Sequence, residues 1–101
     1  MVHHIITFEI KENETSKALK IINEYFTDLD KNGPAGMRSF CYRDTEDSER
    51  FILFNSFREP SKANKYKKSS QFSDCISKLS LISISKPLAR EFVVEESFNS
   101  M

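Results

Sequence analysis

Three polar side chains set in apolar surroundings are the residues of this sequence that could do chemistry. Asn55 is the one amide within the apolar run 51–57, and a buried amide needs hydrogen-bond partners. Tyr66 brings a phenol that could hydrogen-bond or deprotonate a substrate hydroxyl, and His4 brings an imidazole suited to general-base work near neutral pH. Each also has a structural alternative: an amide satisfied by the fold, a tyrosine at the core edge with a wet hydroxyl, and a structural histidine.

Charged residues and short motifs add few further candidates. Arg90 could pair with an anionic substrate group, or with Glu9 in a salt bridge at an interface between two copies. Four lysines between positions 62 and 68 could attract an anion, but a solvated helix face is the simpler interpretation. His3 and His4 are neighbours in a strand and point to opposite faces, so they cannot share a metal. The sequence has no phosphate-cradling glycine loop, Cys-x-x-Cys spacing or nucleophile elbow, so neither a metal nor a cofactor is expected.

Length and charge narrow the class of protein. The chain has 101 residues, which suggests one domain over 1–101. Its 15 Lys and Arg balance 15 Asp and Glu, and a neutral chain is a poor candidate for binding nucleic acid. No apolar run approaches the length of a membrane span, and the N-terminal stretch lacks a signal-peptide pattern. Cys41 and Cys75 are far apart and favour free thiols in a reducing cytosol, so a cytoplasmic protein is expected.

Hydrophobic periodicity divides the chain into four strands and three helices. Strands are predicted at 4–11, 37–43, 51–57 and 88–96, and helices at 14–31, at 60–68 and from about 70 to 79. An apolar stripe that includes Tyr25 runs from Ala18 to Leu29 of the long helix. Gly33 is expected to end this helix in the left-handed conformation. Pro60 suits the first turn of the second helix, and Ser69 or Ser70 can cap the third.

This order of elements, β-α-β-β-α-β with the second helical unit broken in two, predicts an α+β, ferredoxin-like fold. Such a fold has one antiparallel four-stranded sheet with its helices on one face. His4, Ile6 and Phe8 are expected on the helix-covered face. The strand 51–57 is apolar on both of its faces, which is typical of a strand covered on both sides. The helix-free face therefore needs a partner, and the simplest is a second copy of the chain, sheet to sheet.

The stretch FNSFREPSKANKYKKSSQF, residues 54–72, resembles the antibiotic biosynthesis monooxygenase family of dimeric α+β barrels. Phe57 stands at the aromatic position that ends the third strand, and Pro60 starts the short helix that follows. Ser69-Ser70-Gln71-Phe72 opens the next helix, and Gly36-Met37 opens the second strand, as in that family. The resemblance implies a homodimer whose two sheets close a barrel, with a pocket between each sheet and its own helices.

The same resemblance implies oxidation of a small aromatic or quinol-like molecule by oxygen without a cofactor. The substrate must then supply the electrons itself. The candidate residues fall into two groups: catalytic Tyr66, Asn55 and His4, and substrate-binding Phe57, Phe8, Phe72 and Arg90. The family also contains members with no assigned reaction. A non-catalytic homodimer that binds a small ligand or another protein is therefore the alternative, and the sequence leaves catalysis open.

Two further functions are not expected. Haem degradation would need an imidazole where this chain has Ile76. An RNA-recognition domain shares the order of elements, but its third strand carries a glycine and an aromatic residue for stacking on a base. Residues 50–57 read RFILFNSF, which has no glycine and places Ile52 at the stacking position.

Overall fold

The computed structural model describes residues 1–100 and has the order of elements that the sequence predicts. The strands are β1 (Val2–Glu9), β2 (Met37–Arg43), β3 (Arg50–Phe57) and β4 (Leu88–Val93), and the helices are α1 (Thr15–Asn32), α2 (Pro60–Lys67) and α3 (Ser70–Ile82). The last strand ends three residues before its predicted end. The last helix continues three residues beyond Leu79, to Ile82.

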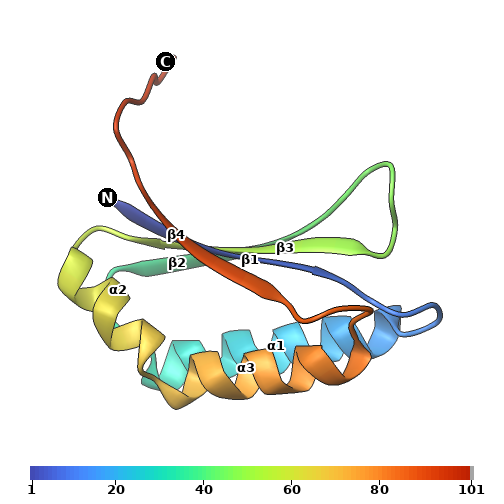
Figure 1. The fold of residues 1–101 in the computed structure, drawn as a ribbon. Coiled ribbons are helices and arrows are strands. Elements are labelled where there is room, and N and C mark those ends of the chain that lie inside the picture. Colours follow the sequence, from blue (N-terminus) through green and yellow to red (C-terminus); the bar gives the residue numbers. More distant parts are fainter. Residues whose placement is uncertain (101) are drawn as a thin grey trace.

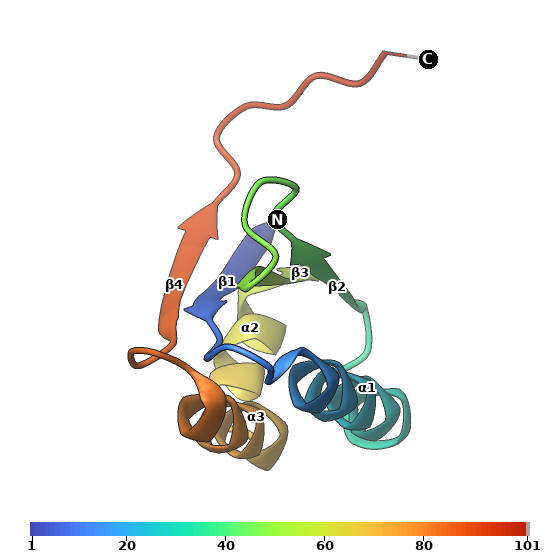
Figure 2. The same ribbon diagram turned by 90° about the vertical axis from the view of Figure 1, so that its right-hand side faces the viewer.

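The four strands form one antiparallel sheet in the order β2-β3-β1-β4. All three helices lie under the same face of this sheet (Figure 1). In the end-on view of Figure 2, α1 and α3 run side by side below the sheet, with β2 at one sheet edge and β4 at the other. This is the ferredoxin-like arrangement, and it confirms the predicted fold class.

The core lies between the sheet and the helices. Val2, Ile6 and Phe8 alternate along β1 and point into it, and Phe51, Leu53 and Phe57 do the same along β3. The apolar stripe of α1 meets these strands from below, as its helical spacing predicts. Phe51, Leu53 and Phe57 are each at most 1% exposed, so solvent is excluded from the centre of the core.

The two glycines differ from expectation in how they act. Gly33 does follow α1, but its backbone is extended (φ −77°) rather than left-handed, so that prediction was wrong. What fixes a glycine there is space: a Cβ on Gly33 would meet the backbone oxygen of Leu29 at 2.5 Å. The left-handed residue is Gly36, with φ +79°, in the turn before β2.

The starts of the later helices follow the sequence signals. Pro60 is the first residue of α2. The Ser69 hydroxyl caps α3 by accepting a hydrogen bond from the backbone N–H of Phe72, at 3.3 Å. The start of α1 is different, because Glu14 holds the cap position without a side-chain cap bond.

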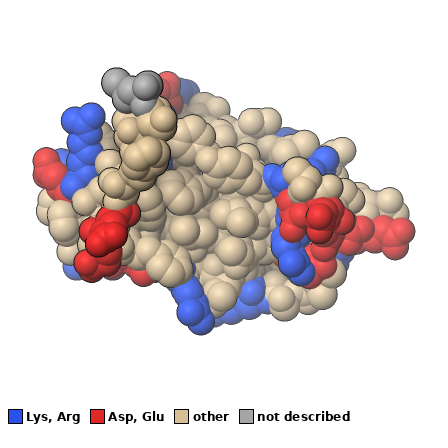
Figure 3. Space-filling view, turned by 90° about the horizontal axis from the view of Figure 1, so that it is seen from above, with Lys and Arg blue, Asp and Glu red and all other residues tan. Residues whose placement is uncertain are grey.

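The helix-free side of the sheet, called here the open face, carries seven apolar residues. They are Ile5, Phe40, Tyr42, Ile52, Phe54, Leu88 and Phe92. Strand β3 is therefore not covered on both sides within one chain, because Ile52 is 38% exposed on this face. Figure 3 looks onto this side: Lys, Arg, Asp and Glu gather at the rim, and the centre carries none of them. In residues 1–100, no helix is both long and apolar enough to cross a membrane.

Candidate functional site

A row of polar side chains crosses the helix-covered face of the sheet, one from each strand. Ser39 of β2 lies opposite Asn55 of β3, Asn55 opposite His4 of β1, and His4 opposite Glu91 of β4. Cross-strand partners share a face of the sheet, so these four residues, called here the polar row, cut across an otherwise apolar surface. A polar row in such a place needs partners, and the helices provide them.

Asn55 is the centre of the row and is fully buried. Its Oδ1 accepts hydrogen bonds from the Ser39 hydroxyl (2.7 Å) and the Tyr25 hydroxyl (3.0 Å). Its Nδ2 donates to the backbone oxygen of His4 (3.2 Å) and, over a longer 3.4 Å, to the Tyr66 hydroxyl. The amide is therefore satisfied by the fold, which was one of the two alternatives that the sequence left open.

Two tyrosines from different helices close over Asn55. Tyr25 comes from α1 and Tyr66 from α2, and their hydroxyl oxygens lie 2.6 Å apart. Both side chains are buried, and burial raises the pKa of each phenol well above its ordinary value. Both phenols therefore keep their protons at neutral pH, and hydrogen bonding rather than proton abstraction is the chemistry open to them.

His4 lies on the other side of Asn55, toward β4. Its side chain is 3% exposed, and its ring packs edge-on against Tyr66 and Phe72, with centroid distances of 5.3 and 5.0 Å. Burial lowers the pKa of His4, with Lys67 acting in the same direction and Glu91 opposing it. Within residues 1–100, the buried Nδ1 of His4 has no hydrogen-bond partner. Glu91 instead pairs with Lys67 of α2, at 3.1 Å.

A cleft of about 370 Å³ opens between the C-terminal half of α1 and strand β2. Its apolar lining comes from Phe26, Leu29 and Met37, its rim includes Asp30, and Ser39 gives it access to the polar row. This volume falls in the range of small-molecule sites, roughly 300–1,000 Å³. The cleft is therefore where a small molecule can approach the buried amide of Asn55, through the Ser39 hydroxyl.

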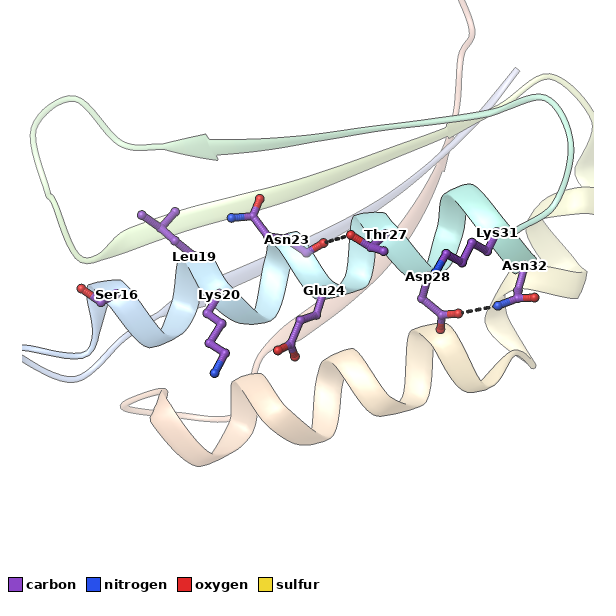
Figure 4. A pocket seen from close by; sticks show the side chains of 9 residues that line it. All are labelled: Ser16, Leu19, Lys20, Asn23, Glu24, Thr27, Asp28, Lys31 and Asn32. Carbon is purple, nitrogen blue, oxygen red and sulfur yellow. Dashed lines mark hydrogen bonds between the residues drawn. The ribbon is translucent and has the colours of Figure 1, made fainter.

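A larger hollow of about 840 Å³ lies along the outside of α1. Figure 4 shows that its side chains all rise from that one helix, and two of its contacts bond the helix to itself: Asn32 to Asp28 at 2.8 Å, and Thr27 to the backbone of Asn23 at 2.9 Å. Among residues 1–100, its lining comes from this one helix, and one of the lining side chains, Glu24, turns away to pair with Lys78 of α3 at 3.8 Å. It is the solvated surface of a helix, and the smaller cleft beside the polar row is the better candidate site.

The structure brings most of the sequence-predicted residues together. Those that gather are Tyr66, Asn55, His4, Phe57 and Phe72, with the Tyr66 ring 5.3 Å from both phenylalanine rings. Phe8 lies farther along β1 and stacks on Phe51, with centroids 5.5 Å apart. Arg90 projects from the open face, opposite Ile5, and so does not reach this group.

Sequence reasoning missed Tyr25 and Ser39, the two residues whose hydroxyls donate hydrogen bonds to the amide oxygen of Asn55. Tyr25 was counted as one of the apolar stripe of α1, although a phenol among alanine, isoleucine and leucine signals a hydroxyl that needs a partner. Ser39 alternates with Met37 and Cys41 on the inward side of β2, and that alternation marks it as inward-facing. Neither residue could be joined to Asn55 without the strand register.

Metal binding and thiol chemistry find little support in the described part of the chain. Across residues 1–100, no group of three His, Cys, Asp or Glu side chains is placed to hold a metal ion. Cys41 and Cys75 are free thiols, as expected. Burial raises the pKa of Cys75 to about 12, so this thiol stays protonated and unreactive at neutral pH.

Comparison with known proteins relates the chain to others through its fold. No protein-family model and no curated protein sequence matches it. A crystal structure of an antibiotic biosynthesis monooxygenase superimposes with a TM-score of 0.77 at 11% identity, covering 95% of this chain and 100% of that one. A proposed antibiotic biosynthesis monooxygenase from Deinococcus radiodurans gives 0.81 at 11% identity, over 100% of this chain and 99% of that one.

A third structure, a conserved protein from Methanosarcina mazei Go1, gives a TM-score of 0.79 at 11% identity, covering 90% of this chain and 89% of that one. Identities this low establish the architecture and leave the reaction open. The chain has the fold of the antibiotic biosynthesis monooxygenases, as the stretch 54–72 predicted.

Proposed function

We propose that the protein binds a small aromatic or quinol-like molecule in the cleft between α1 and β2 and oxidises it with dioxygen, without a cofactor. One observation carries the proposal: Ser39 lines the cleft and is hydrogen-bonded, at 2.7 Å, to the buried amide of Asn55. A cleft that combines apolar side chains with a few placed polar groups, here Ser39 and Asp30, is typical of a small-molecule site. The monooxygenases that share the fold supply the reaction class, by analogy.

The reaction that fits this site takes all its electrons from the substrate. With 1-naphthol as the example, one atom of dioxygen enters the ring and the other leaves as water, so the products are 1,4-naphthoquinone and water. Loss of the hydroxyl proton makes the ring electron-rich enough to reduce oxygen. Asp30 is the carboxylate that lines the cleft, and we assign it the role of proton acceptor.

The residues behind the cleft act by holding its floor. Asn55 fixes the Ser39 hydroxyl, and the tyrosine pair fixes Asn55. Tyr66 itself is held between Phe57 and Phe72. His4 lies beyond Asn55 from the cleft, so its proposed part is to anchor the amide through its backbone oxygen. These are positioning roles rather than contacts with the reacting atoms.

Oxygen consumption with 1-naphthol tests the oxidation. The expected result is protein-dependent uptake with one atom of ¹⁸O₂ appearing in the quinone, and a large loss of this activity in Asn55→Leu. Heat-denatured protein controls for spontaneous oxidation. Absence of protein-dependent uptake across a panel of electron-rich phenols and quinols would remove the oxidation from the proposal.

A second candidate function is a non-catalytic homodimer, and two observations favour it. The hydroxyls and amide of Tyr25, Asn55 and Tyr66 are paired with one another, so they leave no reactive group free. The open face is apolar at its centre and charged at its rim, as a surface that meets a second copy would be (Figure 3). Arg90 and Phe8 would then serve the interface and the core, respectively.

The two candidates differ in what the purified protein does. A dimer in light scattering that neither binds nor oxidises aromatic compounds supports the second candidate and contradicts the first. A dimer that binds 1-naphthol with shifts at Met37 and Ser39, and consumes oxygen, supports the first. The dimer itself is common to both.

A further inference from the structure

We infer that the cleft selects a ligand that presents a hydrogen-bond donor to Ser39, such as an aromatic hydroxyl or amine, and disfavours the matching ether or carboxylate. This rests on the proposed function, because it concerns the same cleft. The reasoning starts from a donor and acceptor inventory of the buried groups behind Ser39. Each such group has a fixed number of protons to give and lone pairs to accept them.

The orientation of the Asn55 amide is settled by His4. One end of the amide lies 3.2 Å from the backbone oxygen of His4. A backbone oxygen can only accept, so this end must be the NH₂ group. The other end, Oδ1, therefore faces Ser39 and Tyr25, and a flipped amide would place an oxygen against an oxygen.

Once the orientation of the amide is fixed, the hydrogen-bond acceptor of each neighbouring hydroxyl group follows. Oδ1 can only accept, so Ser39 and Tyr25 both donate to it, at 2.7 and 3.0 Å. Tyr25 has then spent its one proton, so in the 2.6 Å contact between the tyrosines Tyr66 is the donor. Tyr66 in turn accepts from the amide NH₂ at 3.4 Å, which closes a ring of three bonds running in one direction.

This closed ring determines what Ser39 can offer a ligand. Oδ1 has two lone pairs, and both are taken, so Ser39 can keep its proton bonded inward without competition from the cleft. In the described part of the chain, the Ser39 hydroxyl makes this hydrogen bond and otherwise neighbours the Tyr25 hydroxyl, whose own proton also goes to Oδ1. Toward the cleft it therefore presents lone pairs, and it accepts rather than donates.

The other side chains that line the cleft offer no hydrogen-bond donor either. Its rim carries the Asp30 carboxylate, another acceptor, and its other side chains have no proton to donate; they are those of Phe26, Leu29, Pro34, Ala35 and Met37. The cleft also lies beside the last turn of α1, which ends at Asn32 and places the negative end of the helix dipole there. Lone pairs, a carboxylate and a helix C-terminus all favour a neutral donor and oppose a ligand that enters as an anion. Transfer of the naphthol proton to Asp30 adds no net negative charge to the cleft, because it neutralises that carboxylate.

Three ligands of similar shape test the selection: 1-naphthol, 1-methoxynaphthalene and 1-naphthoate. Each is titrated into the ¹⁵N-labelled protein, and binding is followed at the amides of Gly33, Met37 and Ser39. 1-Naphthol is expected to bind about fivefold or more tightly than its methyl ether, the difference that one hydrogen bond makes, and naphthoate more weakly still. An ether or carboxylate that binds as well as the naphthol would overturn the inference.

Variants of Ser39 separate this inference from the proposed function. Ser39→Ala is expected to reduce naphthol binding about fivefold, to the level of the ether, and to leave ether binding unchanged, while Ser39→Thr keeps the preference. Thermal unfolding of each variant shows that the fold persists. A preference that survives Ser39→Ala contradicts the inference alone. Failure of all three compounds to shift the cleft amides contradicts the proposed site as well.

Discussion

At the scale of single residues, the main feature is the buried ring that Tyr25, Asn55 and Tyr66 form. Its members come from α1, β3 and α2, and each gives and receives a hydrogen bond within the ring. A hydrogen bond of this kind contributes about 1 kcal/mol net, but leaving a buried partner unpaired costs about 1–3 kcal/mol. The ring therefore matters more through what its loss would expose than through what each bond adds.

Replacing Asn55 tests this asymmetry. Asn55→Leu leaves the Ser39 and Tyr25 hydroxyls and the His4 backbone oxygen without their partner, so the free energy of unfolding is expected to fall by about 3 kcal/mol. Urea denaturation measures it. Asn23→Leu, on the exposed side of α1, is the matched control and is expected to change stability by less than about 0.5 kcal/mol. Equal effects at the two positions would show that the buried bonds do not hold the fold.

His4 makes stability depend on pH. Burial lowers the pKa of His4 in the folded protein below the ordinary value of 6.5. Between pH 6.5 and that lower pKa, His4 is therefore protonated in the unfolded chain but neutral in the folded one. The free energy of unfolding is therefore expected to be greatest above pH 6.5 and to fall as the pH drops toward the folded pKa. His4→Gln should flatten this slope between about pH 7 and 5, above the range where carboxylates titrate.

The neighbouring histidine is the control for this pH dependence. His3 lies on the opposite face of β1 and packs at a tilt against Phe54 of the open face, with centroids 4.5 Å apart. His3→Gln should keep the slope that His4→Gln removes. If both variants keep the wild-type slope, His4 is not the group responsible.

Part of this site could be predicted from sequence, and there is a physical reason why Asn55 was found while Tyr25 and Ser39 were missed. Asn55 was conspicuous because an amide within an apolar strand breaks a local pattern. Tyr25 fitted its helical stripe, so periodicity concealed its hydroxyl. Ser39 has no unusual neighbours at all, and its importance arises from facing Asn55 across β2 and β3. Patterns along the chain show local exceptions, whereas the partners of those exceptions depend on non-local pairing.

At the scale of elements, the connection from α1 to β2 decides the shape of the cleft. Gly33 and Pro34 line it, and Gly33 also lets the chain leave the helix close against Leu29. The sequence correctly indicated a helix end at this glycine. It gave the wrong conformation, because the left-handed rule for helix ends describes a common motif, and here the constraint is contact with the backbone of Leu29.

The two glycines of this turn can be told apart by substitution. Gly33→Ala puts a Cβ 2.5 Å from a backbone oxygen and is expected to cost about 1–3 kcal/mol, although its φ of −77° suits alanine. Gly36→Ala meets no atom within 4 Å, and its cost, about 1 kcal/mol, comes from its φ of +79°.

Asparagine distinguishes these two causes. Asn tolerates the left-handed region, so Gly36→Asn should recover most of the stability lost in Gly36→Ala, as measured by thermal unfolding. Gly33→Asn should recover nothing, because its Cβ meets the same oxygen of Leu29. Recovery at position 33 would mean that conformation, rather than contact, fixes that glycine.

At the scale of the whole molecule, the sheet separates two different surfaces. One carries the core, the polar row and the helices, and the other is the open face with exposed Phe40, Tyr42 and Phe92. The sequence predicted a sheet covered on both sides from the apolar residues on both faces of β3. In the single chain only one side is covered, and a second copy is the proposed cover for the other.

The proposed dimer can be tested by charging the open face. Phe40→Glu is expected to shift the protein from twice the chain mass toward the mass of one chain in light scattering, because it places a carboxylate in an apolar interface. Leu81→Glu is the control: Leu81 is more exposed, at 77%, but lies on α3, away from the open face. A wild-type protein that is monomeric at high concentration would contradict the homodimer.

The three-residue ring also has a consequence for how this sequence can change over generations. Replacing any one member leaves the other two without a partner, whereas replacing all three by apolar residues of similar size removes the three bonds of the ring together. Only the Ser39 hydroxyl, which faces the cleft, and the His4 backbone oxygen then lose a partner. Substitutions at 25, 55 and 66 should thus show strong epistasis, each harmful alone and tolerated in combination. Homologous chains are expected to inherit these positions as a set, either all polar or all apolar.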